Sequence, residues 1–159
     1  MAVEVRDEET PKERIDRELT EMLQGLRVAV VGVQVLFAFL LTVPFSARFA
    51  PAGPFRRAVF LISLLAAAAS TVCFIAPAIQ HRVLFRQRDK ERLLWRSNRY
   101  GEAGAVFLIV AVTAAVLLVT DAVEARWLGA LVAAAVALGT GWAWLGQPWR
   151  AREQARRSR

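Results

Sequence analysis

Acidic side chains beside apolar sequence are the residues of this chain that could do chemistry. Glu102 and Asp121 lie at the two boundaries of the charge-free apolar run 103–120. Pumps and antiporters generally need a carboxylate embedded in the membrane. Glu102 and Asp121 are therefore the transport candidates of this sequence, at positions that flank the run and do not lie inside it.

Three uncharged polar residues lie deeper in apolar sequence. Gln34 lies about seven residues into the run 28–45, and Ser70 and Thr71 lie eight or nine residues before the end of the run 58–79. These depths match if the two runs are antiparallel helices. We therefore expect Gln34 to bond to the Ser70 or Thr71 hydroxyl, an interaction worth roughly 0.6–2 kcal/mol in membranes. Contact with a substrate or an ion is the alternative interpretation of Gln34.

Residue types that serve metal and nucleophile chemistry do not cluster in the sequence. His81 has no second His or Cys near it in the chain, which argues against a metal site. Cys73 is the one cysteine, so no intramolecular disulfide can form. No segment resembles a phosphate-binding glycine loop, a zinc motif or a nucleophile with an adjacent base. We expect no enzymatic activity and no cofactor.

Four apolar runs determine the elements that hold these residues. Hydrophobic residues make up 56% of the 159 residues and charged residues 22%, and the charges are concentrated between the runs. A helix needs about 20 apolar residues to cross the hydrocarbon core, and its backbone groups must bond to one another there. The sequence therefore predicts an all-α integral membrane protein, a four-helix transmembrane bundle with spans at about 28–45, 58–79, 103–120 and 127–145.

The distribution of Lys and Arg predicts the orientation of these spans. Residues 1–27, the connection 80–101 and the tail carry 17 of the 21 basic residues, whereas the connections 46–57 and 121–126 carry four. Basic residues accumulate on the cytoplasmic side of a membrane. We therefore expect both termini and the 80–101 connection in the cytoplasm, and the chain in a bacterial plasma membrane.

Residues 1–10 are acidic and are expected to be disordered, and a helix is expected to start directly after them. Thr10 suits an N-cap, Pro11 the first helical position, and Glu13 the position from which a capping-box carboxylate reaches back. Acid–base pairs at i,i+4 spacing follow, namely Glu13/Arg17, Arg14/Glu18 and Arg17/Glu21. We expect one helix over about 11–45, of which 11–27 extends into the cytoplasm.

The connection 80–101 is expected to be a helical hairpin that projects into the cytoplasm, with its turn at 87–89. It is rich in bases, whereas residues 1–27 hold eight acids against five bases. Because the two segments carry opposite charges at the same expected distance from the membrane, we expect acids of one to contact bases of the other. The acids are Asp16, Glu18 and Glu21, and the bases are Arg86, Arg92 and Arg96. The alternative is a solvated basic loop held near anionic lipid headgroups, worth about 1 kcal/mol per Lys or Arg.

Small residues in the fourth run predict close helix packing. Gly129, Ala133, Ala137 and Gly141 recur every four positions, a pattern that lets two helix backbones approach each other. The pattern does not distinguish a contact within the chain from a homodimer through the fourth span. The residues that follow, 146–159, form an Arg-rich cytoplasmic tail, whose charge is explained by topology and not by nucleic-acid binding.

Three segments resemble the signature of a bacterial family of small four-span membrane proteins of unknown function. They read ETPKERIDRELTEMLQGLRV, its continuation GVQVLFAFLLTVPF, and the later DKERL. The resemblance covers roughly residues 8–121 and is most specific in the first 45. It implies the four-span topology, and some members of such families carry the label sodium/proton antiporter.

Together these features predict a non-enzymatic structural, scaffolding or regulatory membrane protein. Its expected partners are membrane lipid, a second copy of the chain, and a cytoplasmic or membrane protein that engages the cytoplasmic helices; nucleic acid is not expected. The rival function is a small oligomeric transporter or channel for cations or protons, which would use Glu102 and Asp121.

Overall fold

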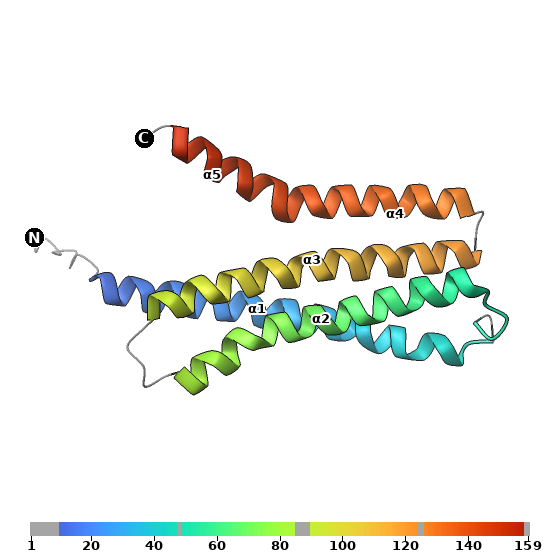
Figure 1. Cartoon of the computed structure of the whole chain (residues 1–159), viewed down its shortest axis with the longest axis horizontal. Helices are drawn as coiled ribbons and strands as arrows, with labels where there is room; N and C mark the ends of the chain where they lie inside the picture. Colours follow the sequence, from blue (N-terminus) through green and yellow to red (C-terminus); the bar gives the residue numbers. More distant parts are fainter. Residues whose placement is uncertain (1–9, 48, 85–89, 124–125, 158–159) are drawn as a thin grey trace, which may run out of the picture.

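The chain folds into long helices joined by short connections. The computed structural model describes residues 10–47, 49–84, 90–123 and 126–157. Figure 1 shows the elements in chain order: α1 (Pro11–Thr42), the 3-10 turn η1 (Val43–Phe45), α2 (Pro54–Leu84), α3 (Lys90–Val123), α4 (Arg126–Gly141), the π turn η2 (Trp142–Gly146) and α5 (Gln147–Arg157). Every regular element in the described ranges is helical, which confirms the predicted all-α class.

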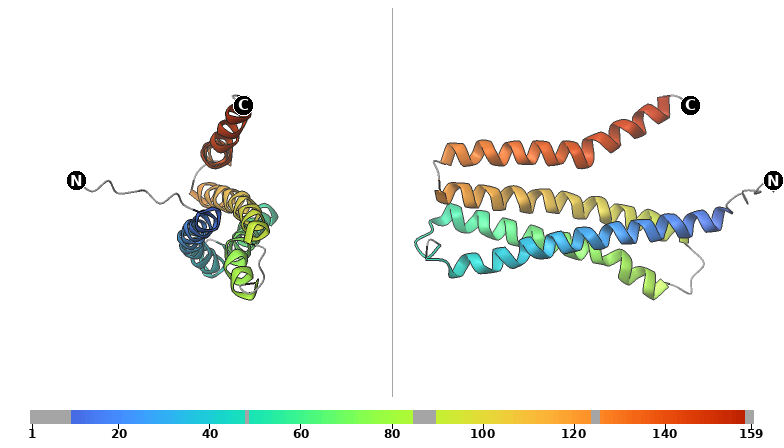
Figure 2. Two further views of the ribbon diagram at one scale, coloured as in Figure 1. Left: turned by 90° about the vertical axis from the view of Figure 1, so that its left-hand side faces the viewer. Right: turned by 180° about the vertical axis from the view of Figure 1, so that it is seen from behind.

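Three helices form one body, and the fourth lies along its side. α1, α2 and α3 contact one another, with the most extensive contact between α2 and α3, whereas α4 packs mainly against α3 (Figure 2). The start of α1 and the end of α5 lie at one end of the molecule, which we call the termini end, together with the end of α2 and the start of α3 (Figure 1). The opposite end, the far end, holds the ends of α1 and α3 and the starts of α2 and α4.

Four helical stretches are long and apolar enough to cross a bilayer. They are Glu13–Phe45, Pro54–Val83, Leu94–Val123 and Arg126–Arg150. Large apolar side chains on their outer surfaces are exposed, among them Val28 (71%), Leu138 (75%) and Phe45 (90%). An apolar surface of this kind needs lipid or a partner to cover it. The four helices therefore have the properties of a multi-pass membrane protein.

Thr10 caps α1 as the sequence predicts. The Glu13 backbone N–H donates to the Thr10 hydroxyl at 3.3 Å, and the Thr10 N–H donates to the Glu13 carboxylate at 2.9 Å. Two predicted i,i+4 salt bridges follow on the exposed face, Arg14–Glu18 at 2.9 Å and Arg17–Glu21 at 3.5 Å. The first turns of α1 are thus stabilised by their own polar side chains, in sequence that precedes the apolar run.

Two serines of α2 bind the backbone of α3 and set the register of this pair. Ser63 Oγ donates to the carbonyl oxygen of Ala111 at 2.8 Å, and Ser70 Oγ donates to that of Gly104 at 2.9 Å. The donors are seven residues apart and so are the acceptors, which places both contacts on one line along two antiparallel helices. Both serines are fully buried. Their bonds join the two helices directly and satisfy hydroxyl groups that are shielded from water.

Small residues let side chains of neighbouring helices approach α3 closely. A Cβ atom added at Gly104 would collide with the ring of Phe74, which is itself buried. Ala111 belongs to the same buried cluster, and α1 contributes Val33 and Leu40, both fully buried. The core of the body is therefore narrow, and substitutions that add volume along α3 would force the helices apart.

Seven residues beyond Ser70 on α2 lies Pro77, and seven residues before Gly104 on α3 lies Ser97. At this pair of positions the serine-to-carbonyl bonds between the helices do not continue. Both residues are fully buried, but the Ser97 hydroxyl has no hydrogen-bond partner within the described ranges. Pro77 lacks an N–H and therefore leaves the carbonyl of Cys73 without its helical donor. α2 diverges from α3 toward the termini end (Figure 1, Figure 2). The α2–α3 contact is thus hydrogen-bonded near the far end and loosens toward the termini end.

Candidate functional site

A buried carboxylate joins three helices at the far end. The Asp121 side chain, near the end of α3, is 5% exposed. Arg56, in the first turn of α2, donates from Nε to Asp121 Oδ2 and from a terminal nitrogen to the Asp121 carbonyl oxygen, each at 2.6 Å. Arg126, the first residue of α4, donates from Nε to Asp121 Oδ1 at 3.3 Å. One acid therefore holds the ends of α2, α3 and α4 together.

An aromatic ring completes this far-end clasp, which consists of Phe55, Arg56, Asp121 and Arg126. The Arg126 guanidinium lies 4.6 Å from the centroid of the Phe55 ring, in a cation–π arrangement. A cavity of about 410 Å³ adjoins the four residues. Each oxygen of the carboxylate accepts from a guanidinium, so the clasp has the chemistry of a structural ion pair.

The sequence draws attention to Asp121 but not to its two partners. Arg56 lies 65 residues from Asp121 in the chain, and Arg126 lies five residues from it. The usable signal is that each arginine stands at the start of an apolar run on the same side as Asp121, where a buried acid needs a base. That signal identifies candidates, and only the packing of three helix ends selects the pairing.

α4 packs on α3 through the first part of its small-residue ladder. Gly129 and Ala133 are buried, whereas Ala137 and Gly141 are half-buried. A Cβ atom at Gly129 would lie 2.9 Å from Thr120 Oγ1, so a larger residue at position 129 would separate the helices. The ladder therefore makes a contact within the chain, and this contact is closest beside the far-end clasp.

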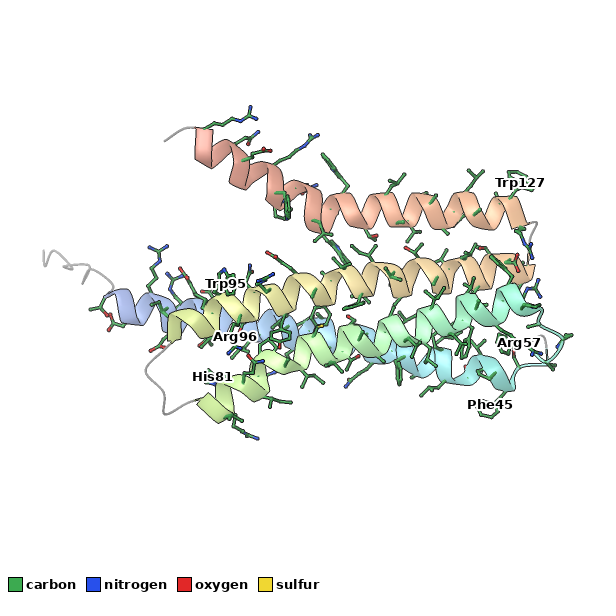
Figure 3. All side chains as sticks on the ribbon, viewed as in Figure 1. Phe45, Arg57, His81, Trp95, Arg96 and Trp127 are labelled. Atoms are coloured by element: carbon green, nitrogen blue, oxygen red, sulfur yellow. The ribbon has the colours of Figure 1, made fainter. Side chains whose placement is uncertain are left out.

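A cleft of about 630 Å³ lies near the start of α3, at the termini end, and its walls come from α2, α3, η2 and α5. Its polar half is lined by Trp95, Arg96, Arg99 and Tyr100 of α3 and by Trp149 of α5; Figure 3 labels Trp95 and Arg96 at this end of α3, and Trp127 at the far end of α4. The Arg99 guanidinium lies 4.9 Å from the centroid of the Trp95 ring. We call this site the termini-end cleft.

The inner half of the termini-end cleft is apolar. It is lined by Cys73 of α2, Ala103 and Val106 of α3, and Leu145 of η2. These four residues lie within the apolar spans predicted from the sequence, whereas the residues of the polar half lie outside them. The cleft therefore crosses the expected boundary between hydrocarbon and headgroups.

A π-helical turn shapes one wall of this cleft. In η2 the N–H of Gln147 bonds to the carbonyl of Trp142, five residues earlier. The next residue, Pro148, has no N–H and would clash with the carbonyl four residues before it in a regular helix, which favours a wider turn at this point. Gly146 leaves room for the Trp142 ring, because a Cβ atom there would lie 2.8 Å from a ring carbon. α5 leaves the direction of α4 after this turn (Figure 1, Figure 2).

Glu102, the other transport candidate, lines the termini-end cleft. It is half-buried, and its Oε1 accepts a hydrogen bond from Asn98 Nδ2 at 2.9 Å. At about 1.5 Å per helical residue, Glu102 and Asp121 lie roughly 28 Å apart along α3. The two carboxylates therefore do not form one site.

The predicted contact of Gln34 with Ser70 or Thr71 is wrong. The Gln34 side chain lies on the exposed surface of α1. Ser70 instead donates to the Gly104 carbonyl of α3, and Thr71 Oγ1 donates to the Ala67 carbonyl of its own helix at 2.9 Å. Depth in the membrane was predicted for these residues, but the rotation of α1 about its axis decides which of its residues face α2.

For the N-terminal helix, the structure corrects the predicted charge contacts of Glu18 and Glu21. Glu18 and Glu21 pair with arginines of α1, since neighbours one turn away need no second helix. Asp16 is half-buried, and its contact with an arginine of α3 stays a prediction. Arg96 is exposed and lines the termini-end cleft. Arg86, the turn at 87–89, the side chain of Arg92 and residues 1–9 lie outside the described part.

Metal-ligating side chains do not gather in the described ranges. No group of three His, Cys, Asp or Glu residues there could hold a metal ion. His81 is half-buried near the end of α2, and Cys73 lies on the apolar wall of the termini-end cleft. Within the described ranges, the far-end clasp and the termini-end cleft each combine charged side chains with a cavity.

The comparisons with known proteins place the chain in one family. The sequence model of the family described as "Family of unknown function (DUF6328)" matches residues 8–148. No curated protein and no solved structure gives a significant match to the chain. The matched region includes three of the four apolar helical stretches in full and the fourth as far as residue 148. It also includes the far-end clasp and every lining residue of the termini-end cleft except Trp149. The chain belongs to the family of unknown function DUF6328.

Proposed function

We propose that the chain is a non-enzymatic scaffold of a bacterial plasma membrane, with both termini in the cytoplasm. The observation that supports this most directly is the helical surface at the termini end. α1 begins at Pro11, α3 begins at Lys90 and α5 continues to Arg157, so three helices extend beyond the apolar runs. Because these charged helices are already formed, they lose little conformational entropy when a partner binds.

The excess of basic residues supports the cytoplasmic placement of the termini end. The test is accessibility to a membrane-impermeant maleimide in cells, in a Cys73→Ser background that carries Gln24→Cys on α1 or Ala50→Cys at the far end. Both positions are exposed. We expect Ala50→Cys to react in intact cells and Gln24→Cys only after permeabilisation. The reverse pattern would overturn the proposed orientation.

The scaffold role is tested by photo-crosslinking in cells at the same two positions. A crosslinker at Gln24 should give a discrete protein adduct, since this position lies on the polar part of α1. A crosslinker at Ala50 is the matched control and should give none. Equal adduct patterns, or no adduct at Gln24, would contradict a scaffold that works through the cytoplasmic helices.

A small oligomeric transporter or channel for cations or protons is the second candidate, and Glu102 in the termini-end cleft favours it. The Asp121 geometry favours the scaffold, because an acid held by two arginines is poorly placed to bind a further cation. Proteoliposomes that contain the wild type, Glu102→Gln or Asp121→Asn should give the same flux as empty liposomes. If the wild type gives flux and either substitution abolishes it, the proposed function changes from scaffold to transporter.

A further inference from the structure

The termini-end cleft changes its chemistry along one helix. Trp95 and Arg96 line the outer part, and Val106 lines the inner part. Over these residues α3 rises by roughly 16 Å at about 1.5 Å per residue. This length suits a polar headgroup together with the first part of an acyl chain, and it crosses the boundary at which both occur in a bilayer.

The polar half offers donors suited to a phosphate group. Arg96 and Arg99 bring two guanidinium groups to one lining, and guanidinium forks match phosphate oxygens in paired hydrogen bonds. Arg99 rests on the Trp95 ring at 4.9 Å, which restricts the freedom of its side chain before a ligand arrives. Two arginines against Glu102 leave the lining with one net positive charge, the complement of a phosphodiester that carries one negative charge.

Glu102 does not oppose an anion as strongly as an isolated carboxylate would. Its Oε1 accepts a hydrogen bond from Asn98 at 2.9 Å, on the helix that also carries the two arginines. The aromatic residues at the rim, Trp95, Tyr100 and Trp149, are of the types that accumulate at headgroup depth in membranes. The polar half therefore combines net positive charge with the side chains typical of the interface.

The apolar half gives a reason for the ligand to be a lipid and not a free phosphate. Cys73, Val106 and Leu145 line it, and each lies within an apolar span. Val106 is 45% exposed, so this wall is available to a hydrocarbon chain. A soluble phosphate would use the arginines and leave this surface uncovered, whereas an acyl chain would cover it and gain about 0.8 kcal/mol per buried CH₂.

We propose that the termini-end cleft is a binding site for one anionic phospholipid, whose phosphate lies between Arg96 and Arg99 and whose acyl chain lies on Val106 and Leu145. The proposal rests on the membrane placement put forward above and not on the scaffold role. Flux in proteoliposomes or failed crosslinking would change the proposed function and leave this site as it is.

Native mass spectrometry of the full chain in mild detergent tests the site directly. Phosphatidylglycerol, phosphatidylcholine and soluble glycerol phosphate are each added in a titration. We expect one phosphatidylglycerol per chain, bound at least tenfold more tightly than phosphatidylcholine, and no retained glycerol phosphate. Equal binding of the two lipids would overturn the proposal, and tight binding of glycerol phosphate alone would show a soluble-phosphate site in its place.

Paired substitutions separate a specific site from general attraction to basic protein. Arg96→Gln with Arg99→Gln should weaken phosphatidylglycerol binding at least tenfold. Arg27→Gln with Arg82→Gln removes the same charge from exposed positions outside the cleft, and it should change binding less than twofold. Equal losses in both variants would show that the lipid responds to net charge only. All four arginines are exposed, so helical content is expected to stay unchanged, which circular dichroism checks.

The apolar half has its own test. Val106→Trp fills the inner part of the cleft and should weaken phosphatidylglycerol binding about fivefold or more, because the acyl chain is displaced while both arginines remain. Val119→Trp places the same ring on an equally exposed position of α3 (45%) and is the matched control. Unchanged binding in Val106→Trp, or equal loss in both variants, would contradict the placement of the acyl chain.

Discussion

The two ends of the α3–α4 pair differ in how the helices are held. At the far end, Asp121 binds Arg56 and Arg126, and Gly129 lies directly against Thr120. At the termini end, the same pair continues into α5 and borders a cleft of about 630 Å³. Charge occurs at both ends, and at the far end each carboxylate oxygen of Asp121 accepts from a guanidinium of the chain.

This difference teaches that charge near a membrane boundary has two uses in one small protein. A carboxylate between two guanidiniums has both oxygens hydrogen-bonded, and it joins the helices that carry the two arginines. Arginines beside aromatic rings and an open cleft leave donors available for a ligand. The far end is thus a fixed point, and the termini end is the part of the molecule equipped to respond to lipid.

The largest effect is expected from removal of the acid of the clasp. Asp121→Ala leaves two guanidiniums without their carboxylate and should lower the free energy of unfolding by about 2 kcal/mol, less than for a fully buried pair because Arg56 is about one-third exposed. Thermal unfolding in detergent measures this loss. Glu153→Ala, at an exposed position on α5, is the control and should change the free energy of unfolding little. An equal loss in both variants would show that the clasp does not stabilise the fold.

A smaller effect is expected from added volume between α3 and α4. Gly129→Val should cost about 1–2 kcal/mol, because the new side chain meets Thr120 and the helices must separate. Gly139 lies on the same helix with no atom within 4 Å of an added Cβ, so Gly139→Val is the matched control. Comparable losses in both variants would mean that helix propensity, and not packing on α3, sets the cost.

The smallest effect on stability is expected from the proline beside the π turn. Pro148→Ala restores a backbone donor and should change the free energy of unfolding by less than about 1 kcal/mol. It should nevertheless straighten the connection of α4 to α5 and weaken phosphatidylglycerol binding, because the wall of the cleft moves. Gln147→Ala is the control. A straightened helix with unchanged lipid binding would show that the π turn does not shape the site.

The fold was predictable from the sequence because its signals are local. Apolar runs without charge predict helices wherever they lie in the chain, and Thr10 with Glu13 predicts the start of α1. The rotation of each helix about its axis was not predictable in the same way. Gln34 illustrates this, since its depth was inferred from its position in the run, yet it faces away from Ser70.

The two sites were predictable only in part, because each combines residues that are distant in the chain. Asp121 was recognised as a boundary acid, but its bond to Arg56 spans 65 residues. Arg96 was expected to face the N-terminal helix, whereas it lines a cleft that needs α5 as its other wall. The position of α5 depends on the π turn before Pro148, a change of backbone geometry that apolar periodicity does not reveal.

The contrast between a fixed far end and a lipid-responsive termini end is tested most directly by spin-label distances in vesicles. In a Cys73→Ser background, labels at Leu41→Cys and Leu131→Cys report on the far end, and labels at Gln24→Cys and Gln154→Cys report on the termini end. All four positions are exposed. The account predicts that phosphatidylglycerol, compared with phosphatidylcholine, narrows the termini-end distance distribution and leaves the far-end distribution narrow and unchanged. Distance distributions of equal width at both ends, or the same change at both ends with the anionic lipid, would contradict the account.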